Sequence, residues 1–522
     1  MTSSSDRFVS TRDDAEPPAL HTLEEAVLKG WADDGGMLMP SDLPSLTRAE
    51  IEAWRGCSYK EVCHKILAMF TDASVISRGE LGDILDGAFD DGAFDIDEVV
   101  RIKAVKDSSS SPSSSSSPSL HVAELWHGPT LAFKDLSMRV LCGYMEKLLE
   151  KRNGRLNLLV GTSGDTGASA IEGVIGKERL SVTVLYPSPE FSSITLEQEY
   201  ETVVHAKAEN VAVICVEGNS DDLDVPMEAV FSDLEFKSRF SLTSVNSVNV
   251  FRVLMQTVHY FYSYLQVVSP REEESACFYV PTGGGGHCSA GILAAQMGLP
   301  VHSVVACVNE NDVLHTLIST GELESRREVV ATLAPSMDIS VPYNVERILF
   351  LLSKQNRAKV KQWMKRWKGE GGQKVDLTER ERVSLAEELR LRSCSTSDKG
   401  ISETIAKVYD ENAYVIDPHT AVAVAAAFAD CEIPTSNVVK IVMACAHPAK
   451  FSEAVSQSLG GNVPMSSWIS EADKKHPAVA DILNLRQRAS APTTLSEHDG
   501  VHHFKKGEDW TTKLKGLLAS LL

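Results

Sequence analysis

The sequence contains no apolar run that approaches the ~18–20 residues needed to cross a bilayer, so we expect no membrane span. Residues 1–18 lack an apolar core and carry four acidic side chains, which argues against a secretory signal or a transit peptide. The ten cysteines form no C-x-x-C pair, and this scatter is typical of reduced thiols rather than of a disulfide framework or a zinc site. We therefore expect a cytoplasmic protein without a bound metal.

Positive charge is also scarce. The 522 residues include 51 Lys and Arg against 72 Asp and Glu, which gives a formal net charge of −21. A surface this acidic repels phosphate backbones and anionic lipids, so we expect neither nucleic acid nor a membrane as a partner. A local pocket can still bind a small anion.

Low-complexity sequence marks one boundary, at residues 107–119. This Ser/Pro-rich segment cannot bury apolar surface and predicts a disordered linker. It separates an N-terminal region, 1–106, from the part of the chain that carries the motifs described below. A second polar stretch, 361–393, has alternating charges and predicts two solvated helices without chemistry.

Short β-branched runs alternate with helical runs through the rest of the chain. Helical stretches occur, for example, at 290–298 and 421–430. The alternation predicts an α/β fold with mostly parallel sheets, in which ligands bind beyond the carboxyl ends of the strands. The predicted buried strands are 156–160, 181–187, 211–218, 277–281, 301–308 and 438–446.

A run of glycines follows the predicted strand at 277–281 and precedes a predicted helix; it comprises Gly283, Gly284, Gly285 and Gly286. Backbone N–H groups that turn inward, together with a helix N-terminus, form a cradle for a phosphate. The run is not a Walker A loop, because no G-K-[ST] follows, and it fails G-x-G-x-x-G at every register. A flexible loop without a ligand is the alternative interpretation.

A second polar loop follows the predicted strand at 156–160. Its hydroxyl and N–H groups suit a carboxylate or a second phosphate. Simple capping of the next helix by an Asp or Thr side chain is the structural alternative. The loop consists of Gly161, Thr162, Ser163, Gly164, Asp165, Thr166 and Gly167.

One lysine, Lys134, stands in the largely apolar stretch 124–137. Lysine is rarely buried unless it is paired or chemically used. Beside a phosphate cradle, a partly desolvated amine is suited to a Schiff base with pyridoxal phosphate. A surface ion pair with Asp135 or Glu124 is the alternative.

These motifs resemble those of threonine synthase, and they occur in the same order. They are HGPTLAFKD, GTSGDTGASAIEG, SVNSVNVFRVLMQ, VPTGGGGHCSAG, NENDVL, PSMDI, NVER, DPHTAVA and AHPAKF. FVSTRD and DDGGMLMP are similar to the usual opening of the family, so the resemblance runs from about residue 8 to about residue 450. The segments ELWHG, VEGNSDDLD and VPYNVERILFLLS look closer to the threonine synthase-like branch, whose animal members are phospholyases.

The resemblance implies a pyridoxal-phosphate enzyme of fold type II. Such enzymes have two parallel-sheet α/β domains with the cofactor in the cleft between them. We expect the domain part that carries the lysine and the TSGDTG loop at 120–260, and the large cofactor-binding domain with a C-terminal extension at 261–522. Residues 1–106 are the accessory region that threonine synthases carry at the N-terminus.

The resemblance also implies roles for individual residues. Lys134 forms the Schiff base and transfers protons, Gly283 to Gly286 hold the phosphate of pyridoxal 5′-phosphate, and Cys445 stands where the family usually has a Thr at the pyridine nitrogen. A thiol is a weaker hydrogen-bond partner than a hydroxyl. The family usually has Asn-Phe at Gly284-Gly285, a change that keeps the backbone N–H groups. The implied substrate-binding residues are Thr162, Ser163, Gly164, Asp165, Thr166, Asn246, Asn249 and Arg252.

The implied activity is the conversion of O-phosphohomoserine and water to threonine and phosphate. The alternative is a phospholyase that forms 2-oxobutyrate, ammonia and phosphate from O-phosphohomoserine or O-phosphothreonine. A non-catalytic binding protein that kept the fold is a third hypothesis. In each case we expect a small phosphorylated amino acid as the ligand and a monomer or homodimer.

Overall fold

The computed structural model describes residues 7–89, 92–107, 120–270, 274–324, 328–369, 372–433, 437–461, 463–488, 495 and 498–521. The predicted linker therefore lies outside the described residues, apart from Asp107. Within the described ranges, no helix is long and apolar enough to span a membrane.

A six-stranded sheet forms one half of the molecule, with the strand order β13-β10-β9-β14-β4-β3. All neighbouring pairs are parallel except β3 and β4. The strands are β3 (Arg101–Val105), β4 (Leu120–Glu124), β9 (Ser275–Pro281), β10 (Val301–Val308), β13 (Leu391–Ser395) and β14 (Val438–Ala444).

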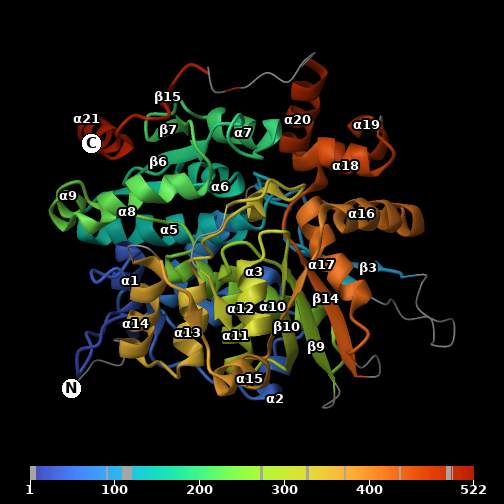
Figure 1. Cartoon of the computed structure of the whole chain (residues 1–522), viewed down its shortest axis with the longest axis horizontal. Helices are drawn as coiled ribbons and strands as arrows, with labels where there is room; N and C mark the ends of the chain where they lie inside the picture. Colours follow the sequence, from blue (N-terminus) through green and yellow to red (C-terminus); the bar gives the residue numbers. More distant parts are fainter. Residues whose placement is uncertain are drawn as a thin grey trace.

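A five-stranded parallel sheet forms the other half, with the order β15-β7-β6-β5-β8. In Figure 1, β6 and β7 lie in the upper part of the molecule, and β9, β10 and β14 lie in the lower part. The strands are β5 (Leu156–Gly161), β6 (Leu180–Pro187), β7 (Val211–Val216), β8 (Leu242–Thr243) and β15 (Val501–Phe504).

Helices cover both faces of the six-stranded sheet. Phe278 and Val280 of β9 belong to the same apolar cluster as residues of α11 (Gly286–Gln296). Their neighbours Cys277 and Tyr279 point the other way, into the cluster that contains α17 (Pro418–Ala429). Because side chains alternate along a strand, burial on both faces requires a continuous apolar run. This is why these strands could be predicted from the sequence.

The N-terminal region packs onto the same core. Residues of α3 (Tyr59–Leu67) share one apolar cluster with α5 (Lys134–Arg152) and α10 (Val250–Val267). Thr22, Thr47 and Ser58 each form a capping box at the start of a helix, which satisfies N–H groups that a helix start leaves free. The other elements of this region are β1 (Phe8–Ser10), α1 (Leu23–Lys29), β2 (Leu38–Pro40), α2 (Arg48–Glu52) and α4 (Arg78–Phe89).

Further helices surround the two sheets and complete the chain. Around the five-stranded sheet lie α6 (Asp165–Val174), α7 (Leu196–Val203), η1 (Asp221–Leu223), α8 (Asp224–Ser232), α9 (Leu234–Arg239) and α21 (Trp510–Leu521). The remaining elements are α12 (Val313–Thr320), β11 (Glu322–Leu323), η2 (Pro335–Met337), α13 (Val345–Leu352), α14 (Arg357–Lys368), β12 (Val375–Asp376), α15 (Glu379–Glu387), α16 (Asp398–Asn412), η3 (Pro448–Phe451), α18 (Ser452–Ser458), α19 (Met465–Trp468), η4 (Asp473–Lys475) and α20 (Pro477–Arg488).

All six strands predicted from apolar runs are present, with ends that shift by up to two residues. The stretch 361–393 contains more than the two predicted helices: β12 lies between α14 and α15, and β13 begins at Leu391. β13 is an edge strand with largely half-buried side chains, so it lacks the apolar run of a central strand. Two strands also cross the expected division at residue 260: β4 joins the six-stranded sheet and β15 joins the five-stranded sheet.

Four loops meet where strands of the two sheets end. β5 leads into α6, and β9 leads through the glycine run into α11. The loop at 125–133 connects β4 to α5, and residues 445–447 follow β14. The last two segments are joined by backbone hydrogen bonds, from Phe133 N–H to the Cys445 carbonyl (2.8 Å) and from His447 N–H to the Leu131 carbonyl (2.9 Å).

Gly128 lies in the 125–133 loop at a position without room for a side chain. A Cβ there would stand 2.7 Å from both Cβ and Oδ2 of Asp135. We expect Gly128→Ala to lower the free energy of unfolding by about 1–3 kcal/mol, as overpacked sites do. Gly87→Ala on α4, where nothing lies within 4 Å of the added Cβ, should be neutral or stabilising. Urea unfolding of both variants measures this; equal stabilities would contradict the packing argument.

Candidate active site

The four loops enclose a cavity between the two sheets. The sequence-predicted residues that line it are Lys134, Thr162, Ser163, Asp165, Thr166, Asn246, Arg252, Gly283, Gly284, Gly285, Gly286 and Cys445. Gly164 and Asn249 are not among the lining residues. Sequence reasoning did not single out Ser247, Gln256, Ser336 and His419, which also line the cavity.

Lys134 begins α5 and reaches into this cavity. Its side chain is 15% exposed, and its Nζ lies 3.1 Å from Oδ2 of Asp165. The surface pairs considered from sequence do not form. Asp135 instead accepts hydrogen bonds from the backbone N–H and hydroxyl of Thr130 (2.8 and 2.7 Å), and Glu124 lies within hydrogen-bond distance of His127 (3.1 Å).

The glycine run passes from the end of β9 into the first turn of α11. Gly285 has φ +80°, a left-handed conformation that glycine adopts without strain. A Cβ added at Gly284 would find its nearest heavy atom at 3.8 Å, an ordinary van der Waals contact, so this backbone is not crowded. Asn344 braces the loop by donating from its backbone N–H and from Nδ2 to the Gly284 carbonyl, both at 3.0 Å.

The second loop turns sharply into α6. Thr162 accepts the backbone N–H of Gly164 on its hydroxyl (3.0 Å). Gly164 has φ +144°, and a Cβ there would lie 2.3 Å from Nε2 of Gln198. Gly164 therefore leaves room for Gln198 to approach the backbone.

Asp165 is the most heavily engaged residue of this loop. Its Oδ1 lies 3.0 Å from Nζ of Lys450 and accepts a hydrogen bond from Nε2 of Gln198 (2.9 Å), and its Oδ2 accepts one from Ser336 Oγ (3.0 Å). Burial would raise the pKa of this carboxyl, but the Lys134 and Lys450 ammonium groups hold it well below its usual value. The resemblance implies a substrate-binding role for Asp165. In the structure its negative charge lies between the Lys134 and Lys450 ammonium groups.

The NSVNVFR segment leads into α10, and its two asparagines bond to backbone carbonyls. Asn246 holds the end of β5 by donating from Nδ2 to the Gly161 carbonyl (2.7 Å). Asn249 caps α10, is fully buried, and donates from Nδ2 to the Val27 and Ser244 carbonyls (2.9 and 3.2 Å). Its amide is therefore occupied within the protein.

Arg252 brings a cation to the cavity wall. Its Nε donates to Ser137 Oγ (2.7 Å) and one terminal nitrogen donates to the Val245 carbonyl (2.8 Å). Burial lowers the pKa of its guanidinium to about 10, so the side chain stays charged at neutral pH. No carboxylate of the described chain lies within ion-pair distance of it, which leaves its charge available for an anion.

Cys445 follows β14, lines the cavity and is half-buried. Burial raises the pKa of its thiol well above the usual range, so the group is neutral. On the same side, Ser336 donates its backbone N–H to Nε2 of His419 (3.0 Å), and Nδ1 of His419 lies 2.9 Å from Asp417. Because Nε2 accepts, the imidazole proton lies on Nδ1.

The residues present fit pyridoxal phosphate. The cavity combines one lysine amine with a glycine run at the N-terminus of α11, and a helix start leaves N–H groups free for a phosphate. Asp165 begins α6, so a second helix N-terminus faces the same space. Such a cavity can therefore hold a ligand that carries two anionic groups.

Comparisons with known proteins agree with this geometry. The family models "Threonine synthase N terminus" and "Threonine synthase, C-terminal" match residues 7–89 and 420–497. The chain is 38% identical to threonine synthase-like 2 of Pongo abelii, over 86% of this chain and 88% of that protein. It is 36% identical to threonine synthase of Pseudomonas aeruginosa, over 88% of this chain and 91% of that protein.

Comparison with solved structures also finds threonine synthases. The fold matches PLP-bound threonine synthase from Brucella melitensis with a TM-score of 0.80 and 29% identity, and yeast threonine synthase with 0.81 and 28%; each match covers 99% of both chains. Fold and site thus define a pyridoxal-phosphate-dependent lyase. The chain belongs to the threonine synthase family. This result removes the hypothesis of a non-catalytic binding protein.

Lys134 is the lysine whose amine lines the cavity. We expect Lys134→Ala to lose the visible absorption band of the bound cofactor, and activity to fall at least ~10²-fold with the loss of its proton transfers. Lys147→Ala removes a partly exposed lysine of the same helix, paired with Glu150, and should keep both. Spectra and phosphate release of the two purified variants test this. A Lys134→Ala protein that keeps the band would contradict the assignment.

Proposed function

We propose that this protein converts O-phosphohomoserine and water to threonine and phosphate. The observation that carries the proposal is the cavity itself, in which the Lys134 amine faces a loop at the N-terminus of α6 and another at the N-terminus of α11. The substrate carries a phosphate, a carboxylate and an amine. A site with one amine and several anion-binding groups suits such a molecule.

The cofactor, when bound, supplies an electron-withdrawing ring that stabilises negative charge at the substrate Cα. Gly283 to Gly286 would hold its phosphate through backbone N–H groups, and Cys445 would face its ring. Lys134 would bind it covalently and, once released, would move the protons at Cα and Cβ. An amine beside a carboxylate such as Asp165, in a partly buried site, is placed for this work.

Arg252 and the 161–167 loop would orient the substrate. A guanidinium matches the geometry of a phosphate group, and Arg252 is a buried cation on the cavity wall. Thr162, Ser163 and Thr166 offer hydroxyl and N–H groups to the substrate carboxylate. Asn246 shapes the end of β5 beside them.

A second candidate function is a phospholyase that releases 2-oxobutyrate, ammonia and phosphate. The 38% identity to threonine synthase-like 2 favours it, as do the segments that resemble that branch. The two reactions share each step up to the loss of phosphate. They differ in whether a water is held at Cβ until it adds.

A product assay separates the two reactions. Purified enzyme is incubated with O-phosphohomoserine, and phosphate, threonine and 2-oxobutyrate are quantified together. We expect threonine and phosphate in equal amounts. Phosphate with 2-oxobutyrate alone would reject the synthase and support the phospholyase, and the same assay with O-phosphothreonine measures β-elimination directly.

Arg252 should affect substrate binding more than turnover. We expect Arg252→Lys to raise KM for O-phosphohomoserine by about 10–100-fold, because a charged hydrogen bond contributes about 1.5–3 kcal/mol. Arg139→Lys, on α5 outside the cavity and bonded to the Ala88 carbonyl, is the control and should leave KM unchanged. An unchanged KM in Arg252→Lys would place the substrate phosphate elsewhere.

A further inference from the structure

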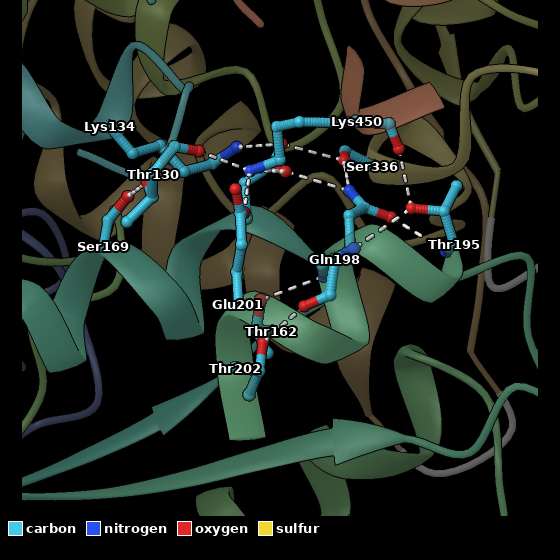
Figure 2. A network of polar contacts seen from close by, with 12 residues as sticks. Thr130, Lys134, Thr162, Ser169, Thr195, Gln198, Glu201, Thr202, Ser336 and Lys450 are labelled. Atoms are coloured by element: carbon cyan, nitrogen blue, oxygen red, sulfur yellow. Dashed lines mark hydrogen bonds and ion pairs between the residues drawn. The ribbon is translucent and has the colours of Figure 1, made fainter. Parts of the chain in front are cut away.

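Four charged side chains form a line behind the cavity. Nζ of Lys134 lies 3.1 Å from Asp165, the other oxygen of Asp165 lies 3.0 Å from Nζ of Lys450, and that ammonium lies 2.6 Å from Oε2 of Glu201. Lys450 is 0% exposed and Asp165 is 3% exposed. Figure 2 shows Glu201 directed from its helix toward Lys450. Only Lys134 and Asp165 reach the cavity.

The line joins four separate parts of the chain, and neutral groups fix it in place. Lys450 lies in η3 after β14 and also donates to the Thr130 carbonyl (2.6 Å). Glu201 lies in α7, together with Gln198, which donates to Asp165. Thr195 caps α7 and donates its hydroxyl to the backbone carbonyl of Lys450 (2.8 Å). These contacts make the arrangement part of the fold rather than a surface pairing.

Glu201 is the least satisfied member of the line. Neither of its oxygens has a hydrogen-bond partner within the described residues, and Lys450 is its ion-pair partner. Burial raises the pKa of its carboxyl to about 8, and the negative charges of Asp165 and Asp135 add to this, while Lys450 opposes it. Glu201 is therefore mostly protonated at neutral pH and ionises as the pH rises through about 8.

Other charged groups near the line have their own partners. Asp135 on α5 is held by Thr130. On α7 itself, Glu197 pairs with Arg486, and Glu199 accepts hydrogen bonds from Tyr186 and from the backbone N–H of Leu495. Glu201 is therefore the carboxyl of α7 that faces Lys450 and, through it, the cavity.

We propose that Lys450 and Glu201 act through Asp165 as positioning residues for the Lys134 amine. Lys450 shares Asp165 with Lys134, so its positive charge weakens the attraction of Asp165 for a protonated Lys134 nitrogen. An ionised Glu201 offsets the Lys450 charge and thereby strengthens that attraction. Glu201 ionises as the pH rises, so its effect grows toward alkaline pH.

This inference rests on the proposed role of Lys134 but not on which product forms, so its test uses absorbance rather than turnover. The visible band of the bound cofactor reports the protonation of its bond to Lys134, and we would titrate it from pH 5 to pH 10 in the full-length, cofactor-loaded enzyme. In Glu201→Gln the negative charge that favours a protonated Lys134 nitrogen is absent at high pH. The midpoint should therefore fall, by on the order of one pH unit.

Two further variants test the direction of the shift and provide a control. Lys450→Gln removes the cation that shares Asp165, so Asp165 acts on Lys134 alone and the midpoint should rise. Glu199→Gln changes a buried carboxyl of the same helix that faces away from Lys450 and should leave the midpoint unchanged. Opposite shifts in Glu201→Gln and Lys450→Gln support the inference. A midpoint in Glu201→Gln equal to that of the wild type, or an equal shift in Glu199→Gln, overturns it.

Discussion

The site depends on one buried carboxylate, that of Asp165. A carboxylate that is 3% exposed is strongly destabilising unless cations and hydrogen-bond donors replace its water. Lys134 and Lys450 supply the cations, and Gln198 and Ser336 supply the donors. These four residues come from different parts of the chain, so satisfying Asp165 brings α5, α7, η2 and η3 to the start of α6. Neutralising this one charge thus brings together the segments that surround the Lys134 amine.

The loops after β5 and β9 complete the cavity. They belong to different sheets, yet both line the same space, and each is followed by a helix whose N-terminus favours anions. A Cβ at Gly284 would meet only ordinary van der Waals contacts, so the backbone there is not crowded. Backbone N–H groups and helix ends can thus add to the Arg252 charge in attracting an anion. The acidic net charge of the chain does not prevent this local attraction.

Local patterns were enough to predict the central strands and the two glycine-containing loops that line the cavity, because a strand buried on two faces needs an apolar run and a tight turn needs glycine. The edge strand β13 was missed, since its exposed side lacks that signal. Sheet membership of β4 and β15 was not predictable either, because strand order is set by contacts distant in sequence. The contact of Lys450 with Glu201 was not predictable for the same reason: Lys450 belongs to the AHPAKF motif and Glu201 to none of the motifs, and the two lie far apart in sequence. The resemblance implied that Asn249 binds the substrate, and in the structure its side chain caps α10.

The cavity separates two tasks that the reaction needs. In the proposed reaction, Lys134, Asp165 and the buried pair behind them would hold and move protons, while Arg252 and the glycine run would bind phosphate groups. Every route from a phosphorylated amino acid uses both, whatever its final product. The two proposed reactions differ in whether water adds at Cβ, so a polar group on the cavity wall bears on the product. Gln256 is such a group, since it lines the cavity and its amide oxygen has no hydrogen-bond partner within the described residues. An acceptor left open in this way binds water more readily than apolar neighbours do.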